Sequence, residues 1–338
     1  MPSMTQPARQ QLSQREIDAV MRRYDIGTIH EIRELPEGSV YSPKVILKTD
    51  RGVLLLKRRA RGLDLPPIVA FSHEVMIGCL ERGSPIPPLL GTREDLNSMV
   101  QHEDHTYELF AYIEGERFDP RNAAHAQQSG MVLSDLHRVM TDLPTSFEPS
   151  VESISVDPSR LALLEPLGGS LPEGCADDLG RMLNYGLELC QANAAPPALV
   201  HGDWHPGNLI FRGPVLVAVC DFDNTRIGSR LREQAQALVY ISMRAPGNGE
   251  SGSTVPAEPA KDSLTAFWSG LMQKCDPSAR PDARNVLGLM PAVMIDEALG
   301  GLGTSRTSSE HAIGLLTAIW RKAAWIDHNQ AQLLDALS

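Results

Sequence analysis

The pattern of apolar and polar positions divides the chain into two parts with different predicted structure. In the first part, residues 41–49 and 53–58 are rich in β-branched and apolar residues and are separated by a short turn that contains glycine. This pattern predicts a β-hairpin. A helix is predicted over residues 68–82, which follow a Pro-Pro pair, and another strand over residues 107–113. The order of strands, helix and strand predicts a small α+β lobe.

From about residue 123 onward the pattern becomes mostly helical. Residues 126–140 and 175–193 have the spacing of amphipathic helices, and the chain after residue 262 has the same character. The exception is the segment of residues 199–223, in which two apolar runs meet at a Gly-Pro turn and can pair as a second hairpin. We therefore expect an α+β protein with a small β-rich N-terminal lobe, residues 1–113, and a mostly helical C-terminal lobe, residues 114–338.

Composition and charge narrow the class of protein. Of the 338 residues, 42% are hydrophobic and 22% are charged, which is typical of a soluble globular protein. No apolar run approaches the roughly 20 residues of a membrane span, and the polar start lacks the core of a secretory signal. The net charge of −11 disfavours nucleic acid and is compatible with a cationic substrate. We expect neither a nucleic-acid nor a membrane partner.

The five cysteines bear on the cellular compartment. Their number is odd, they are widely scattered, and none forms a Cys-x-x-Cys pair. This usage argues against a disulfide framework and against a zinc site, and it favours the reducing cytoplasm. The sequence leaves the oligomeric state open, and a homodimer is among the states that it allows.

The strongest chemical signal is the stretch from His201 to Asn208, together with the Asp-Phe-Asp that follows the next apolar run. Asp203 lies on a predicted loop, where a carboxylate can aim an attacking hydroxyl and accept its proton. Asn208 begins one apolar run and Asp221 follows the other, so a hairpin would bring both side chains to the same end. Their oxygens are hard ligands of the kind that Mg²⁺ prefers. The sequence predicts an ATP-dependent kinase that uses Mg²⁺, with Asp223 as a further metal ligand or a substrate contact.

Two alternatives remain open at this stage. His201, Asp203 and His205 have a spacing that also occurs at the transition-metal sites of hydrolases. No other cluster supplies further ligands, however, and that interpretation leaves Asn208 without a role, so we expect His201 to hold the loop backbone instead. The second alternative is a nucleotide- or metabolite-binding pseudokinase without transfer activity, although none of the expected kinase residues is missing.

The nucleotide phosphates need a cation, and Lys57 at the end of a predicted strand is the candidate, with Lys48 as a rival. Glu74 lies on or beside the apolar face of the first-lobe helix, where an acid needs a partner. We expect Glu74, rather than Glu81, to pair with Lys57. Ser39, at the tip of the preceding hairpin, could cover the phosphates through backbone N–H groups, and an ordinary turn is an equal alternative there.

Together these residues resemble the aminoglycoside phosphotransferase and choline kinase superfamily, near its homoserine-kinase-like and spore-coat-kinase-like bacterial branch. The resemblance covers nearly the whole chain and runs through GVLLLKR, FSHEVMIGCLERGSPIPPLLGT, YELFAYIEGE, SGMVLSDLHRVM, HGDWHPGNLIF and VCDFDNTRIGSRLREQA. It implies a protein-kinase-like bilobal fold, ATP and Mg²⁺ as cofactors, and a small-molecule hydroxyl as acceptor. By this resemblance Asp203 is the catalytic Asp, Asn208 and Asp221 bind magnesium, and Lys57 with Glu74 clamps the phosphates. Adenine would be held by the backbone of Phe110, Tyr112 and Ile113.

The chain departs from protein kinases at several positions. Gly202 and His205 stand where protein kinases carry an Arg before the catalytic Asp and a Lys two residues after it, and Asp223 replaces the glycine of Asp-Phe-Gly. These differences indicate a small-molecule substrate. Within the family, Glu233-Gln234-Ala235 stands where Asp-Leu-Ala is usual, and the longer Glu233 side chain leaves its support of the catalytic loop an open question.

Candidate contacts for the acceptor are less specific. Trp204 could stack on a sugar, with core packing as the alternative, and His205 and Asp223 are further candidates. Residues 245–259 are dense in Gly, Ser and Pro and predict a surface loop of the kind that varies with the substrate. An amine of an amino sugar, amino alcohol or amino acid could meet an acid such as Asp262, Asp296 or Glu297.

Overall fold

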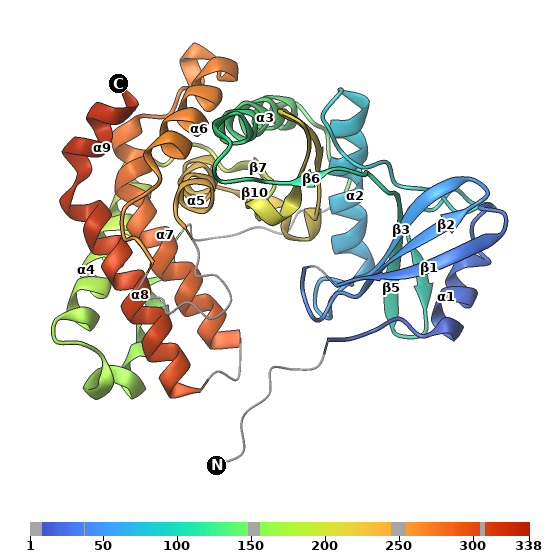
Figure 1. The fold of residues 1–338 in the computed structure, drawn as a ribbon, viewed down its shortest axis with the longest axis horizontal. Coiled ribbons are helices and arrows are strands. Elements are labelled where there is room, and N and C mark those ends of the chain that lie inside the picture. The colour runs from blue at the N-terminus through green and yellow to red at the C-terminus, as the bar shows by residue number, and fades with distance from the viewer. Residues whose placement is uncertain (1–8, 37, 148–155, 245–254, 305–307) are drawn as a thin grey trace.

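The computed structural model describes residues 9–338 except for residues 37, 148–155, 245–254 and 305–307, and it has two lobes (Figure 1). The N-terminal lobe is built on an antiparallel five-stranded sheet with strand order β1-β2-β3-β5-β4. Helix α2 lies between this sheet and the C-terminal lobe (Figure 1). The elements of this lobe are α1 (Gln14–Met21), β1 (Ile29–Leu35), β2 (Lys44–Thr49), β3 (Gly52–Arg58), α2 (Pro66–Glu81), β4 (Val100–His102) and β5 (His105–Ala111).

The two faces of the sheet pack against different partners. Along β3, Leu54 and Leu56 alternate with Leu55 and Lys57, so the two pairs point to opposite faces. Leu54 and Leu56 join a core with helix α1, whereas Leu55 packs against the main core, which includes residues of α2 and of the C-terminal lobe. Lys57 therefore points to the side of the sheet on which the two lobes meet.

The C-terminal lobe is mostly helical, and α3 and α6 are packed closely together. A Cβ atom on Gly130 would lie 2.1 Å from Phe267 O, and one on Gly270 would lie 2.0 Å from Gln127 O. Glycine at both positions lets the two backbones approach. The helices are α3 (Ala123–Thr141), α4 (Cys175–Ala192), α5 (Arg230–Ser242), α6 (Lys261–Lys274), α7 (Ala283–Thr304), α8 (Ser309–His328) and α9 (Gln330–Leu337), with 3₁₀ segments η1 (Pro158–Ser170), η2 (Pro206–Asn208), η3 (Phe222–Asn224) and η4 (Pro277–Ala279).

In the described part of this lobe, five short strands position the connecting loops. β8 (Leu209–Arg212) and β9 (Val215–Val219) form an antiparallel hairpin, and β6 (Glu116–Arg117) pairs with β8. β7 (Ala198–Val200) pairs with β10 (Arg226–Gly228). The loop that leaves β7 therefore lies beside the loop that leaves β9.

The predicted fold class is confirmed, and most of the predicted elements are present. Both hairpins form, and the predicted helices end within a few residues of the observed ones. A hairpin with Ser39 at its tip was expected, but no range was predicted for its first strand, β1, because the apolar residues of β1 recur at every third position and none is fully buried. The short strands β4, β6, β7 and β10 also escaped prediction. Residues 245–254 of the predicted surface loop lie outside the described residues.

Helix α7 departs from the expectation that no segment is long and apolar enough to span a membrane. Its residues Ala283–Gly303 are long and apolar enough to span a membrane, and no other described helix is. Most of this stretch, 61%, is buried inside the protein, where α7 contacts α4, α5 and α8. A core helix can be equally long and apolar, and the packing of α7 is that of a core helix.

Candidate active site

The loop from His201 to Asn208 connects β7 to β8 and carries Asp203. Its path depends on Gly202, whose φ of 83° lies in the left-handed region. A Cβ atom at this position would lie 2.1 Å from the backbone oxygen of Asn224. Glycine is required both for the backbone angle and for this close approach, which explains why the position before Asp203 carries no side chain.

His201 is fully buried and fixes the loop backbone with both ring nitrogens. Nε2 donates to Cys220 O at 3.0 Å, and Nδ1 accepts from Asp203 N at 3.2 Å. Burial lowers the pKa of His201 more than the nearby carboxylates raise it, so the ring is neutral. Neither nitrogen offers a free lone pair to a metal ion. In the part of the chain that the structure describes, no group of three or more His, Cys, Asp and Glu side chains could hold a metal, so the hydrolase alternative lacks a ligand set.

Glu233, in the first turn of α5, supports the same loop. Its Oε1 accepts from Gly202 N at 2.5 Å, and its Oε2 accepts from His201 N at 3.3 Å and from His137 Nε2 at 2.6 Å. Burial would raise the pKa of Glu233, but His137 and the loop N–H groups outweigh it and lower the pKa to about 2. The longer side chain therefore reaches the loop, which answers the question that the sequence left open.

Asp203, near the start of this loop, and Asn208, at its end, lie side by side. Asn208 Nδ2 donates to Asp203 O at 3.0 Å and to Asp203 Oδ2 at 3.1 Å. The Asp203 side chain is 31% exposed, whereas Asn208 is buried. Asn208 Oδ1 accepts no hydrogen bond from the described residues, so this oxygen is available to a cation.

The β8–β9 hairpin brings Asp221 to the same end as Asn208, so the predicted pairing of the two apolar runs is confirmed. Cys220 N donates to Asn208 O at 2.8 Å, which joins the two strand ends directly. Asp221 itself has a φ of 64°. A left-handed backbone is uncommon outside glycine and is concentrated at functional sites. Asp203, Asn208 and Asp221 thus lie on two adjoining loops.

Two lysines from the N-terminal sheet reach Asp221. Lys57 Nζ donates to Asp221 Oδ1 at 2.9 Å, and Lys44 Nζ donates to Oδ2 at 3.2 Å. Burial would raise the pKa of Asp221, but the two lysines hold it well below its usual range. Lys44 was not predicted, although the tight turn between β2 and β3 sets it opposite Lys57 in register. The rival candidate Lys48 is exposed on the same strand.

The expected ion pair between Lys57 and Glu74 is wrong. Glu74 accepts hydrogen bonds from the backbone of residues 146–147, with a shortest distance of 2.7 Å. Lys57 Nζ instead lies 2.5 Å from Asp223 Oδ1 and 3.7 Å from Glu108 Oε2. Lys57 and Glu108 are cross-strand partners on β3 and β5, so they share one face of the sheet. The buried acids beside Lys57 are therefore Glu108 and Asp223.

Glu108 is fully buried in the N-terminal lobe, where Arg59, Lys57 and His73 surround its carboxylate. Arg59 Nε donates to Glu108 Oε1 at 2.8 Å, and His73 Nε2 lies 2.6 Å from the same oxygen. Burial would raise the pKa of Glu108, but Arg59, Lys57 and His73 hold it below its usual range. Asp223 is also buried and lies 3.4 Å from Arg59 Nη2. Asp223 is thus a partner of buried cations, and these contacts do not support the expected role of Asp223 as an acceptor contact.

Trp204 is a second correction. Its side chain is fully buried, and its Nε1 donates to Ser129 Oγ on α3 at 3.0 Å. The ring packs in the core of the C-terminal lobe, so it has no face on which a sugar could stack. Of the two alternatives for Trp204, core packing is correct.

The backbone expected to hold adenine is partly engaged within the protein. Phe110 pairs with Leu55 in the sheet, and Tyr112 N donates to Val53 O at 3.0 Å. No hydrogen bond from the described residues reaches the backbone N–H of Ile113 or the carbonyl oxygen of Tyr112. Of the three expected residues, these two adjacent groups remain available to a ligand.

Ser39 lies in the loop between β1 and β2, where its Oγ accepts from Tyr41 N at 3.2 Å. The neighbouring Gly38 has a φ of 82°. A Cβ atom on Gly38 would lie 3.1 Å from Lys44 Nζ, which in turn contacts Asp221. The loop therefore reaches over the lysines next to the candidate metal ligands.

Comparison with known proteins identifies the family. The model of the phosphotransferase enzyme family matches residues 31–253, or 223 of 338 residues. The chain belongs to the phosphotransferase enzyme family. The predicted class of enzyme, a small-molecule kinase, is thereby confirmed, as is the resemblance to aminoglycoside phosphotransferases.

Individual relatives of this phosphotransferase agree with the family. A homoserine kinase of Pseudomonas aeruginosa (strain UCBPP-PA14) is 29% identical over 242 residues, which cover 70% of this chain and 73% of that protein. The structure of a microcompartment-associated aminopropanol kinase aligns with a TM-score of 0.68 at 15% identity, over 94% of this chain and 97% of that one. A spectinomycin phosphotransferase in complex with ADP and spectinomycin aligns with a TM-score of 0.61 at 13% identity, over 95% and 99% of the two chains. The two structures show a shared fold.

Beside Asp203, the C-terminal lobe of the phosphotransferase presents a polar wall. His205 Nε2 lies 3.5 Å from Asp203 Oδ2, and the centroid of its ring lies 5.8 Å from that of Tyr240. Burial would lower the pKa of His205, but Asp203 outweighs it and raises the pKa. Tyr240 OH donates to Glu297 Oε2 at 2.5 Å, and burial raises the pKa of Glu297. His205 therefore adjoins the candidate base, and Tyr240 on α5 and Glu297 on α7 continue the polar surface from His205.

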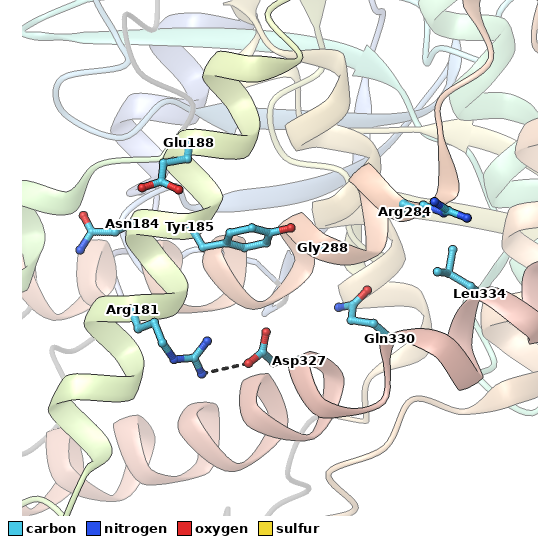
Figure 2. Close-up of a pocket in the computed structure, with 9 residues that line it drawn as sticks. All are labelled: Arg181, Asn184, Tyr185, Glu188, Arg284, Gly288, Asp327, Gln330 and Leu334. Atoms are coloured by element: carbon cyan, nitrogen blue, oxygen red, sulfur yellow. Dashed lines mark hydrogen bonds and ion pairs between the residues drawn. The ribbon is translucent and has the colours of Figure 1, made fainter.

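A cavity of about 640 Å³ lies elsewhere in the C-terminal lobe of the phosphotransferase. Figure 2 shows that its walls come from α4, α7 and the α8–α9 junction, with Tyr185 directed from α4 toward Gly288 on α7. Arg181 Nη2 donates to Asp327 Oδ2 at 2.9 Å along one side. None of residues 201–208, Lys44, Lys57 and Asp221 lines this cavity, so it is separate from the candidate active site.

Proposed function

We propose that this phosphotransferase moves the γ-phosphate of ATP to a hydroxyl group of a small molecule that also carries an amine. Amino sugars, amino alcohols and amino acids are the candidate acceptors. The proposal is supported above all by Asp203, Asn208 and Asp221, which occupy two adjoining loops with two lysines beside Asp221. In this proposal residues 1–113 bind the nucleotide, and residues 114–338 carry out catalysis and bind the acceptor.

Asp203 is the proposed base. The transition state of phosphoryl transfer is loose, so the attacking hydroxyl needs aiming more than activation. Asp203 suits this task because its carboxylate is partly exposed, while the loop that carries it is held by His201 and Glu233. The carboxylate would accept the proton of the hydroxyl late in the transfer.

Asn208 and Asp221 are the proposed ligands of Mg²⁺. Both offer hard oxygens from the same end of one hairpin, and one or two such groups are the usual protein share of a magnesium site. The lowered pKa of Asp221 keeps its carboxylate ionised at neutral pH. When bound, the ion would neutralise charge on the phosphates of the nucleotide.

Lys57 and Lys44 are the proposed phosphate contacts. Both are held beside Asp221 here, and Lys57 is anchored from the other side by Asp223 and Glu108. A lysine is a compact charge on a flexible stem, so each can move from the carboxylate to a phosphate oxygen. The adenine ring would lie against the strand end at Phe110, with its polar edge on the free backbone groups of Tyr112 and Ile113.

Glu297 is the proposed partner of the acceptor's amine. Of the three acids considered, Asp262 is exposed on α6, and Asp296 is already paired with Arg232 at 3.0 Å and with Arg160 at 2.9 Å. Glu297 lies 3.9 Å from Arg232, and its other contacts are the neutral Tyr240 and Gln236. Two of the matched relatives are kinases of homoserine and of aminopropanol, which are small hydroxyl compounds with an amine.

A coupled ADP-release screen tests this proposal. The purified protein with Mg-ATP is offered homoserine, aminopropanol, ethanolamine, choline, aminoglycosides and neutral sugars. We expect acceptor-dependent ADP release with one class of amine and none with neutral sugars, and Glu297→Gln should raise KM for that amine. Nucleotide binding without turnover on any acceptor would favour the pseudokinase alternative. All five cysteines are free thiols, which suits the reducing cytoplasm in which we place this activity.

A further inference from the structure

A short N-terminal segment lies along the β1–β2 loop. Arg9 Nη2 donates to Gly38 O at 3.0 Å, and Arg9 Nη1 donates to Ser39 O at 3.2 Å. Gln10 N donates to Val40 O at 2.9 Å. Three successive carbonyl groups of the loop are therefore held by two residues that lie about 30 positions earlier in the chain.

The segment is itself anchored to the sheet next to Lys57. Gln10 Oε1 accepts from Arg58 Nη2 at 2.9 Å, and Arg58 is the residue that follows Lys57 on β3. Arg58 Nη1 donates to Glu16 Oε1 at 2.6 Å, and Tyr107 OH donates to the same oxygen at 2.8 Å. Burial would raise the pKa of Glu16, but these hydrogen bonds and those of the helix N-cap lower it to about 2. The Gln10 side chain thus anchors the segment to Arg58, while Arg9 and the backbone of Gln10 hold the loop.

The backbone N–H groups of Gly38, Ser39 and Val40 have no acceptor among the described residues. Successive free N–H groups in a turn make a concave site for anions. The position of Gly38, where a Cβ atom would lie 3.1 Å from Lys44 Nζ, puts these groups next to the lysines that face Asp221.

We propose that Arg9 and Gln10 hold the β1–β2 loop in the conformation that binds the phosphates of ATP. Arg9 is then a positioning residue, since it contacts the outer side of the loop and acts on the nucleotide through it. The inference rests on the proposed function, because it assumes that ATP occupies the site beside Lys44 and Lys57. It adds a part of the chain that precedes the region matched by the family model, which begins at residue 31.

Measurements of nucleotide affinity test this inference without knowledge of the acceptor. Dissociation constants for Mg-ATP and for adenosine are measured by calorimetry for the wild type, Arg9→Ala and Arg9→Lys. We expect Arg9→Ala to weaken Mg-ATP binding about fivefold, the size of a well-placed exposed charged contact, and to leave adenosine binding unchanged. Arg9→Lys should fall between, because a lysine cannot bind two carbonyl groups with one planar group. Arg15→Ala, which removes the same charge from an exposed site on α1, is the matched control and should match the wild type.

The outcomes separate the inference from the proposed function. A wild-type protein that binds neither Mg-ATP nor adenosine would overturn both. If the wild type binds Mg-ATP and Arg9→Ala binds it equally well, the inference alone is wrong. Equal weakening for Mg-ATP and adenosine, or a matching loss in Arg15→Ala, would also overturn it, because either result indicates general destabilisation or a long-range charge effect.

Discussion

The two walls of the candidate active site are built in different ways. On the C-terminal side, the loop of residues 201–208, which carries the proposed base, is held by contacts to its backbone, chiefly from His201 and Glu233. On the N-terminal side, Lys57 is held by side-chain charges, from Asp221, Asp223 and Glu108. Backbone contacts fix the position of a loop whatever the state of the ligand. A cluster of charges, in contrast, can exchange partners when phosphates and a cation arrive.

The difference also explains which wall could be predicted from the sequence. The loop of residues 201–208 is a contiguous motif, so its candidate residues can be recognised from their spacing along the chain. The partners of Lys57 lie 51, 164 and 166 positions away along the chain, so they depend on how strands and lobes come together. Substitutions that change one wall at a time can therefore test whether the C-terminal wall is fixed and whether the N-terminal wall adjusts to the ligand.

The largest expected effect is that of Asp203→Asn on the catalytic wall. We expect kcat to fall about 1000-fold, since loss of a positioned base typically costs 10²- to 10⁴-fold, and Mg-ATP affinity to change by less than about twofold. Steady-state kinetics on the acceptor found in the screen and calorimetric titration with Mg-ATP measure the two quantities. The midpoint of thermal unfolding serves as the control and should stay unchanged, because the backbone contacts of the loop do not involve the Asp203 carboxylate. Residual turnover near that of the wild type would remove Asp203 from the role of base.

The N-terminal wall, which carries Lys57, is tested by comparing Glu108→Gln with Glu74→Gln. The first change leaves Lys57 and Arg59 buried with one fewer negative partner, and loss of one member of a buried ion pair costs about 3 kcal/mol or more. The second change weakens hydrogen bonds to the exposed backbone of residues 146–147 and should cost less than about 1 kcal/mol. Urea unfolding measures both. A larger loss of stability and of Mg-ATP affinity in Glu74→Gln would restore the pairing that the sequence predicted.

Some residues of the candidate site could be predicted from the sequence and others could not, for physical reasons. The approach of Asn208 to Asp221 could be predicted because they sit at the ends of two apolar runs that pair with each other, and Asp203 precedes Asn208 on the same loop. The roles of the three residues stay predictions. Glu108 could not be assigned from the sequence because its pairing with Lys57 depends on the register between β3 and β5, which are separate strands with α2 and β4 between them along the chain. Glu74 was misassigned because helical spacing shows which face a residue occupies and not what covers that face.

Acid titration of Glu233→Gln tests the scaffold on the catalytic wall. The pKa of Glu233 is about 2 in the folded protein, below the value of about 4.3 for an unperturbed Glu. Its contribution to stability, about 3 kcal/mol, is therefore fully present above pH 5 and is lost as the pH falls toward 2. Glu233→Gln should be less stable at pH 7 and should lose less stability than the wild type between pH 5 and pH 3. The exposed Glu310→Gln is the control. Parallel stability curves for the wild type and Glu233→Gln would show that Glu233 does not hold the loop as an anion.

The smallest expected effect comes from a comparison within the C-terminal lobe, between a residue that supports the fold and a residue that can contact the acceptor. Trp204→Phe removes a buried hydrogen bond to Ser129 and part of the ring, so we expect a loss of about 1–2 kcal/mol in stability. Because Trp204 has no exposed surface, KM for the acceptor should stay within about twofold of the wild-type value. Tyr240→Phe, at a residue that is 40% exposed, should do the reverse and raise KM with little change in stability. If Trp204→Phe raises KM while Tyr240→Phe does not, the acceptor lies on the side of the catalytic loop that this structure fills with protein.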